Sequence, residues 1–104
     1  MSLDIGRVLS ALADPTRREL VDLLASAGPR TASELSEHFE ITRQGVMKHL
    51  RVLSDAGVLA TQRSGREVRY RVDEATVRDS ARWFAERADI WDRQLAGLKR
   101  AVEG

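Results

Sequence analysis

Residues 42–57 read Thr-Arg-Gln-Gly-Val-Met-Lys-His-Leu-Arg-Val-Leu-Ser-Asp-Ala-Gly, and this stretch decides the fold of the chain. Val46, Leu50 and Leu53 recur at helical spacing, so they form the apolar seam of one amphipathic helix, which Gly57 ends. The polar face carries side chains that donate hydrogen bonds to phosphates and base edges, namely Arg43, Gln44, Lys48 and Arg51. The pattern predicts a helix over 42–56 that suits the major groove of DNA.

Two strand-like runs follow this helix, at residues 58–63 and 67–72. The three residues between them include Gly65, which supplies the turn of a β-hairpin. Alternation gives the second strand an apolar face, made of Val68, Tyr70 and Val72. Its other face carries Glu67, Arg69 and Arg71. We therefore expect the apolar face to pack on the body and the charged face to meet solvent or phosphate.

Capping signals predict two helices upstream of this stretch. Asp14 before a proline is typical of an N-cap and opens a helix over 15–27. Thr31 followed by Glu34 fits a capping box that opens a helix over 32–39. Because only a short turn separates this helix from the basic helix that follows, the two form a helix-turn-helix.

Two features upstream and within the basic helix leave alternatives open. Arg17 and Arg18 either contact the DNA backbone or form surface ion pairs with the acids nearby, which are Asp14, Glu19 and Asp22. Gly45 lies inside the predicted helix, where glycine costs about 1 kcal/mol relative to alanine. It either permits close approach to DNA or is simply tolerated.

An apolar heptad pattern runs through the last segment, residues 73–103. Its members are spaced alternately four and three apart and are Val77, Ala81, Phe84, Ala88, Trp91, Leu95, Leu98 and Val102. A seam of this length indicates packing against another helix, most simply a second copy of the chain together with an N-terminal helix within 1–13. The expected dimer interface comprises Ile5, Leu9, Leu12, Phe84, Trp91, Leu95 and Leu98. The alternative is that the seam covers the protein's own core, a task also open to Trp83 and Ile90.

Charge is distributed unevenly along the chain. The 17 basic and 16 acidic residues give a net charge of +1. Seven of the basic residues but only two of the acids lie within residues 42–71, which leaves ten basic and 14 acidic residues elsewhere. A basic helix and hairpin on an acidic body is the distribution expected of a nucleic-acid-binding protein. On charge alone, an ordinary solvated face is the alternative.

Length and composition limit the remaining classes of protein. With 104 residues and 42% hydrophobic content, we expect one domain over 1–104. It would comprise an N-terminal helix (1–13), a DNA-binding core with its hairpin (15–72) and a C-terminal dimerisation helix (73–103). The absence of cysteine excludes disulfides and fits a cytoplasmic location. No apolar run approaches about 18 residues and no leader pattern opens the chain, so we expect no membrane partner. Without nucleophile, paired-acid or phosphate-loop motifs, neither an enzyme nor a cofactor is expected.

A series of positions matches one known family in order and spacing. These are Ala13, Asp14, Pro15, Thr16, Arg17, Leu20, Leu23, Leu24, Leu35, Ser36, Lys48, His49, Leu50, Leu53, Ala56, Gly57, Val58, Leu59, Arg63, Gly65, Arg66 and Tyr70. On these residues the chain resembles the ArsR family of bacterial winged helix-turn-helix repressors. The resemblance implies a mainly α fold with a small β-hairpin, dimerising through its terminal helices. It also implies a homodimeric DNA-binding regulator that represses its own operon, with helix 42–56 in the major groove and hairpin 58–72 as the wing.

One departure from the family bears on metals and effectors. Metal-sensing members use cysteines in the third helix, or histidines and carboxylates in the last. Here the third helix offers only His38, and the last helix contains neither histidine nor cysteine. We therefore expect no metal site. No small-molecule effector is identified either, and Trp83 and Trp91 either line a ligand pocket or belong to packing.

The expected DNA contacts fall on the basic helix and the hairpin. Arg43 and Gln44 lie in the first helical turn and are the predicted base readers, because arginine pairs with guanine and glutamine with adenine. The other expected contacts are Ser33, Thr42, Lys48, His49, Arg51, Arg63, Arg66 and Arg69. His49 has a packing role as its alternative. Two copies would bind a pseudo-palindromic operator in double-stranded DNA, with half-sites about 34 Å apart. The alternative function is a dimeric winged-helix module that binds a protein without specific DNA binding.

Overall fold

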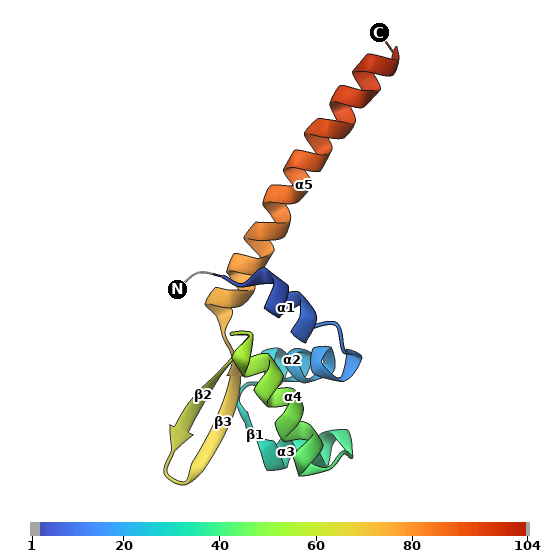
Figure 1. Cartoon of the computed structure of the whole chain (residues 1–104). Coiled ribbons are helices and arrows are strands. Elements are labelled where there is room, and N and C mark those ends of the chain that lie inside the picture. Colours follow the sequence, from blue (N-terminus) through green and yellow to red (C-terminus); the bar gives the residue numbers. More distant parts are fainter. Residues whose placement is uncertain (1–2, 104) are drawn as a thin grey trace.

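The computed structural model describes residues 3–103. In chain order its elements are α1 (Ile5–Ala11), α2 (Pro15–Ala27), β1 (Arg30–Thr31), α3 (Ala32–Phe39), α4 (Arg43–Asp55), β2 (Leu59–Ser64), β3 (Glu67–Val72) and α5 (Glu74–Glu103). Figure 1 shows the first four helices and the strands gathered into one body, from which α5 extends alone. The fold is mainly α with a small antiparallel sheet, as the sequence predicts.

Local hydrogen bonds explain the helix boundaries, which for α2 to α5 agree with those predicted to within one residue: α4 spans 43–55 where 42–56 was expected, and α5 begins at 74 and not 73. Asp14 caps α2 because its carboxylate accepts the Arg17 N–H at 3.0 Å. The capping box of Thr31 and Glu34 is formed at the start of α3. Gly57 follows the end of α4 at φ 82°, in the left-handed region that favours glycine. These signals act over three or four residues, so they can be recognised in the sequence.

The paired arginines at the start of α2 hold the end of α1 in place. The Arg17 Nε–H donates to the carbonyl of Ala11. Arg18 Nη1 donates to the carbonyls of Leu12 and Ala13 at 2.7 and 3.0 Å. The last carbonyls of a helix lack partners within it, and the two guanidinium groups supply them. Neither arginine forms an ion pair with Asp14, Glu19 or Asp22 in the described part of the chain, so the ion-pair alternative is wrong.

The sheet has a third strand that the sequence did not predict. The strand order is β1-β3-β2, and both pairings are antiparallel. The two residues of β1 lie opposite Tyr70 and Arg69. Two residues are too few to show alternation, and only the contact with β3 makes them a strand. The hairpin turns at Gly65, with φ 61°, and its first strand spans Leu59 to Ser64, one residue later than expected at each end.

The core lies between α1, α2, α3, α4 and the start of β2. Its buried members are Val8, Ala11, Leu20, Leu24, Ala32, Leu35, Val46, Leu50, Leu53, Val58 and Leu59. Tyr70 and Val72, from the predicted apolar face of β3, pack against this cluster. Each fully buried leucine contributes about 1.5–3 kcal/mol. The apolar seam of α4 belongs to this core, which turns the polar face of the helix outward.

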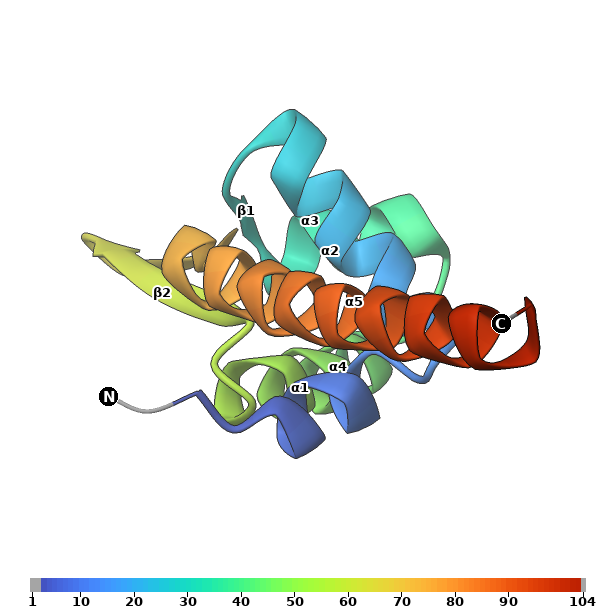
Figure 2. The same ribbon diagram turned by 90° about the horizontal axis from the view of Figure 1, so that it is seen from above.

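The long helix α5 contributes no buried residue. It spans 30 residues and makes the molecule elongated, with principal extents of 66 × 28 × 21 Å. In the view from above, α5 crosses the body, with α1 and α4 on one side of it and α2 on the other (Figure 2). The core of the body is therefore complete without α5. No helix within residues 3–103 has the length and apolar character that a membrane span requires.

Candidate nucleic-acid interface

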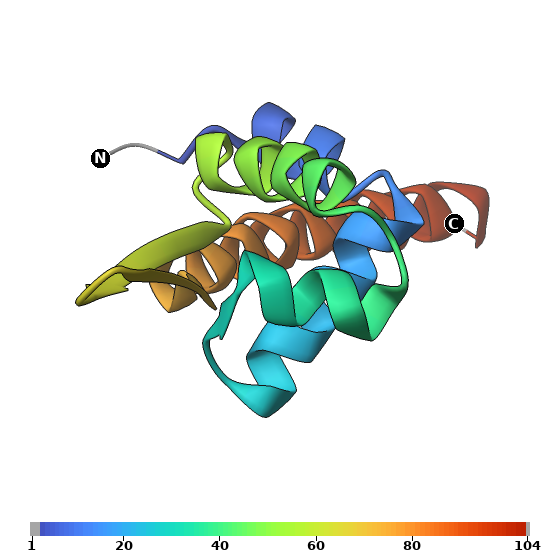
Figure 3. The same ribbon diagram turned by 90° about the horizontal axis from the view of Figure 1, so that it is seen from below.

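The polar face of α4 is exposed along its whole length. Its seam residues Val46, Leu50 and Leu53 have no exposed surface, so the orientation of the helix is fixed by the core. The exposed side chains are Arg43, Gln44, Lys48 and Arg51. The start of α4 lies at the end of the molecule away from the free end of α5 (Figure 1). In the view from below, α3 and α4 lie across this end of the body, and the hairpin projects to one side of them (Figure 3).

Local structure at the start of α4 makes it suited to an anion. Thr42 caps the helix, since its hydroxyl accepts the Gly45 N–H at 3.0 Å. Ser36 steadies the preceding turn by donating its hydroxyl hydrogen to the Ile41 carbonyl at 2.6 Å. Glu40 ends α3 in the left-handed conformation, with φ 53°. The turn thus directs the positive end of the α4 dipole, together with the first-turn side chains, away from the body.

Two adjoining hollows collect most of the predicted DNA contacts. The first lies between α3, α4 and the hairpin, and its lining includes Ser33, Arg43 and Arg66. The second lies along α4 and is lined by Thr42, Gln44, Gly45, Met47, Lys48 and Arg51. Met47 borders both hollows. Residues far apart in the sequence are thereby brought onto one surface, which we call the α4–wing surface.

The tip of the hairpin presents two arginines to solvent. Arg63 and Arg66 are exposed on either side of Gly65. Neither belongs to an ion pair or side-chain hydrogen bond among residues 3–103. An exposed guanidinium without a carboxylate partner is available to a phosphate.

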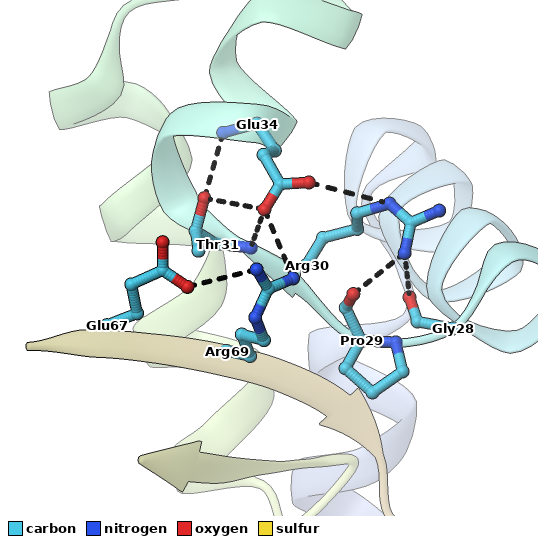
Figure 4. Close-up of polar contacts among 7 residues, drawn as sticks. All are labelled: Gly28, Pro29, Arg30, Thr31, Glu34, Glu67 and Arg69. Atoms are coloured by element: carbon cyan, nitrogen blue, oxygen red, sulfur yellow. Dashed lines mark hydrogen bonds and ion pairs between the residues drawn. The ribbon is translucent and has the colours of Figure 1, made fainter. Parts of the chain in front are cut away.

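Arg69 is placed differently from the other predicted contacts. Its Nη1 lies 3.3 Å from Glu34 Oε1, and its Nη2 lies 3.0 Å from Glu67 Oε2 (Figure 4). Arg30 Nε lies 3.8 Å from the other oxygen of Glu34. We expected the charged face of β3 to meet solvent or phosphate, but Arg69 on this face forms ion pairs, one of them with α3. Sequence reasoning assigned Glu34 only its capping role, since no local pattern connects it to a residue 35 positions away.

Two carboxyl groups that cap helices, Glu34 and Asp14, have perturbed pKa values. The Thr31 N–H hydrogen bond, followed by the Thr31 hydroxyl and the charges of Arg69 and Arg30, holds the pKa of Glu34 below its usual value. The Arg17 N–H hydrogen bond, assisted by the charge of His49, lowers the pKa of Asp14. His49 is half-buried and lies near the start of α2. This position favours its packing alternative.

The predicted dimer residues divide into two groups. Ile5 and Leu12 are half-buried and pack against the core of their own protomer. The others are exposed, namely Leu9 at 42%, Phe84 at 51%, Trp91 at 66%, Leu95 at 58% and Leu98 at 64%. Because α5 buries nothing, the alternative that its seam covers the protein's own core is wrong.

The second stripe of α5 behaves only partly as an intramolecular surface. Trp83 is half-buried, and the Arg87 guanidinium carbon lies 4.2 Å from its ring centroid. Ile90 remains 46% exposed. A hollow beside Trp83 is lined by Leu3, Asp79, Arg82, Trp83 and Glu86. Trp91 does not line it. Among residues 3–103, no three His, Cys, Asp or Glu side chains are arranged to hold a metal ion.

Comparisons with known proteins agree with this geometry. Residues 12–62 match a helix-turn-helix domain family. The chain is 33% identical over 91 residues to the transcriptional repressor SdpR of Bacillus subtilis (strain 168), a match covering 88% of this chain and 100% of SdpR. An ArsR-like transcriptional regulator from Rhodococcus sp. RHA1 has a similar structure, with a TM-score of 0.85, 35% identity, and coverage of 92% of this chain and 90% of that one.

A second solved structure carries information on assembly. It is the homodimeric winged helix-turn-helix DNA-binding domain of a possible ArsR-family regulator from Mycobacterium bovis. It has a TM-score of 0.65 and 28% identity, and the match covers 85% of this chain and 78% of that one.

Proposed function

Since the chain belongs to the ArsR family of winged helix-turn-helix transcriptional regulators, we propose that it is a homodimeric repressor that binds a specific DNA operator. One observation carries the proposal. The exposed cations of α4 and the hairpin tip lie around one surface, at the end of the molecule away from the free end of α5. Two similar proteins support it, since SdpR is named a transcriptional repressor and the M. bovis domain is described as a homodimeric DNA-binding domain.

Within each protomer, the α4–wing surface supplies two kinds of contact. Arg43 and Gln44 read base edges, because they are exposed in the first turn of α4, where a helix in the major groove meets the bases. Arg66 and Arg63 bind phosphate or enter the minor groove beside the site. The remaining side chains contact the phosphate backbone of DNA and so fix the register of α4 on the duplex. They are Ser33, Thr42, Lys48 and Arg51.

The dimer is formed by α5 with help from α1. Trp91, Leu95 and Leu98 each expose more than half of their surface, which is unfavourable for a seam left in water. A second copy covers this seam through the same residues, as a two-fold axis requires. The pairing places two recognition helices on one face of DNA. The operator is then a pseudo-palindrome with half-sites about 34 Å apart.

A selection experiment tests the proposal. The full-length protein is used to select duplexes of about 30 base pairs from a random pool, long enough for two half-sites one turn apart. Binding of the selected duplex is then compared with a scrambled duplex by mobility shift, followed by footprinting. Selective retardation with two related half-sites is expected. Binding to the DNA upstream of its own gene would support repression of its own operon.

The opposite result is equally clear. Equal weak binding to selected and scrambled duplexes, or no binding at low salt, would contradict the proposal. The second outcome would favour a winged-helix module that binds a protein. Binding of a protein would not by itself explain why unpaired arginines at the wing tip lie close to the basic first turn of α4, whereas binding of a polyanion would.

A further inference from the structure

We propose that Glu34 and Arg69 form a brace that sets the position of the wing relative to α4. On this view Arg69 assists DNA binding by holding the wing in place, and it does not contact phosphate itself. The inference rests on the proposed function, because the α4–wing surface must bind DNA for the brace to matter. It also reassigns a residue that the sequence marked as a DNA contact.

Glu34 joins three parts of the fold through one carboxylate (Figure 4). Its Oε1 accepts hydrogen bonds from the Thr31 N–H at 3.3 Å and the Thr31 hydroxyl at 3.1 Å. The same oxygen accepts a hydrogen bond from Arg69 Nη1 at 3.3 Å. Its Oε2 lies 3.8 Å from Arg30 Nε, and Arg30 Nη1 in turn donates to the Pro29 carbonyl at 2.8 Å. The cap of α3, the strand β1 and the wing strand β3 therefore meet at one carboxylate.

The position of Arg69 along the hairpin explains why this contact sets the wing. Thr31, the last residue of β1, pairs with Arg69, so the backbone support of the wing ends there. Beyond Arg69 towards the tip, Val68 is half-buried and residues 63–67 are exposed. The side chain of Arg69 thus makes the ion pair to α3 at the edge of the supported region. A small rotation at this point would displace Arg66 near the tip, which lines the same hollow as Arg43.

The guanidinium of Arg69 is already occupied by two carboxylates. Besides Glu34, it donates to Glu67 Oε2 at 3.0 Å, and its side chain is only 35% exposed. A phosphate would have to compete with both carboxylates for the positive charge of this guanidinium. Arg66 has no such partner among the described residues and can bind a phosphate at no comparable cost.

The variant Glu34→Gln distinguishes the two roles considered for Arg69, because they predict changes of opposite sign in DNA affinity. If Arg69 contacted phosphate and Glu34 merely masked it, Glu34→Gln would free a cation and remove a negative charge, and DNA affinity would rise. If the pair is a brace, the same variant loosens the wing and affinity falls, despite the more favourable net charge. Glutamine preserves the capping box at this position, so α3 itself is kept.

The experiment measures affinity for the selected duplex over a range of salt concentrations. For Glu34→Gln we expect affinity to fall by up to about fivefold, the most that an exposed ion pair supplies, with an unchanged salt slope. The matched control is Glu37→Gln, which removes the same charge from an exposed position on α3 outside the ion pairs described. Its affinity should be equal to or slightly above that of the wild type.

Arg69→Gln and the double variant complete the test. Arg69→Gln should lower affinity to the same extent as Glu34→Gln, and the double variant should lower it no further, because both break one contact. The salt slope should be unchanged, whereas loss of a phosphate contact lowers it by about 0.9. In the free protein, amide exchange of residues 61–72 should be faster in both single variants.

Three outcomes would overturn the brace. Tighter binding by Glu34→Gln or a shallower salt slope for Arg69→Gln would assign Arg69 to phosphate. Additive losses in the double variant would show that the two residues act independently. These results presuppose that the wild type selects a duplex. If it selects none, the proposed function fails, and the brace fails with it.

Discussion

At the scale of single residues, the arginines of this protein divide by what their guanidinium groups meet. Arg17 and Arg18 bind backbone carbonyls, and Arg69 binds carboxylates. Arg43 and Arg66 are exposed at the α4–wing surface. The basic character of residues 42–71 therefore overstates the number of cations available to DNA. Predictions about binding follow from these surroundings and not from charge alone.

Substitution of the two exposed arginines should have different consequences. Arg43→Ala should reduce discrimination between the selected and scrambled duplexes by about 1–3 kcal/mol, because a bidentate base contact is lost. Arg66→Ala should weaken binding to both duplexes alike and lower the salt slope by about 0.9. Mobility shifts at several salt concentrations measure both effects. Wild-type binding by either variant would remove that residue from the site.

Gly45→Ala should stabilise the protein by up to about 1 kcal/mol, because alanine has a higher helix propensity than glycine and residue 45 lies in the first turn of α4. The added Cβ would lie 3.2 Å from Thr42 Oγ1, so the hydroxyl must shift by a few tenths of an ångström. Glu34 shows that a Cβ is accepted at the equivalent position of α3, where its N–H still donates to Thr31 Oγ1 at 3.2 Å. Urea unfolding measures the change.

Gly97→Ala is the control for this substitution, since nothing lies within 4 Å of the new Cβ. It should show the helix-propensity gain without any effect on a cap. A loss of stability in Gly45→Ala would mean that the cap of α4 does not adapt. A stable variant with weakened DNA binding would instead indicate close approach of the duplex at this glycine.

Stability should decline in acid through two capping carboxylates. The pKa values of Asp14 and Glu34 are lowered from 3.8 and 4.5, mainly by hydrogen bonds from the Arg17 and Thr31 N–H groups. A lowered folded-state pKa means that the ionised form stabilises the fold above the unfolded-state pKa. That contribution is lost as pH falls from about those values through the lower folded-state ones.

Urea unfolding between neutral pH and pH 3 tests this expectation. Asp14→Asn retains a capping side chain but removes the titration, so its stability should vary less with pH than that of the wild type. The same slope in both proteins would show that Asp14 contributes nothing to acid sensitivity.

At the scale of elements, α5 differs from the other helices within residues 3–103, because it alone contributes no buried residue and leaves its apolar seam exposed. Leu95→Glu should therefore convert the dimer to a monomer, because a carboxylate would be buried in the paired seam. Ala96→Glu adds the same charge at an exposed position outside the seam and is the control. Light scattering after gel filtration gives the mass of each variant.

The fold of the body should survive Leu95→Glu, since α5 contributes nothing to the core. Circular dichroism of the monomer should show the body helices retained, with some loss from α5. A dimer in Leu95→Glu would place the interface elsewhere. An unfolded monomer would mean that dimerisation is needed for folding, as happens in some small domains.

At the scale of the whole molecule, the two proposed functions, DNA binding and dimerisation, lie at different places along its long axis. The α4–wing surface lies at one end of the body, and the α5 seam extends from the other (Figure 1). In the proposed dimer, pairing through the seam would fix the distance between the two DNA-binding ends. Inserting about five base pairs between the half-sites turns one of them to the opposite face of the duplex. We expect tight binding to be lost and partly regained with about ten, and mobility shifts on the spaced duplexes measure this. Equal binding at all spacings would show that the two protomers read DNA independently.

Much of this architecture was predictable because its signals are local. The caps at Asp14, Thr31 and Thr42 act over three residues, and the turn at Gly65 needs one positive φ. The seams of α4 and α5 repeat at helical spacing, and the exposure of the α5 seam agrees with a role in pairing. The candidate contacts Arg43 and Gln44 follow from their place in the first turn of a helix whose buried face is known.

By itself, the sequence determined the helices, the hairpin and the side of α4 that faces outward, since each depends on residues within a few positions of one another. Only the tertiary structure decided that Arg30 and Thr31 form a strand, that Arg17 and Arg18 bind the end of α1, and that Arg69 meets Glu34. Those contacts depend on where separate elements lie in space. An ionic or backbone contact across 35 residues leaves no periodic trace in the chain, so it emerges only once the core has placed both partners.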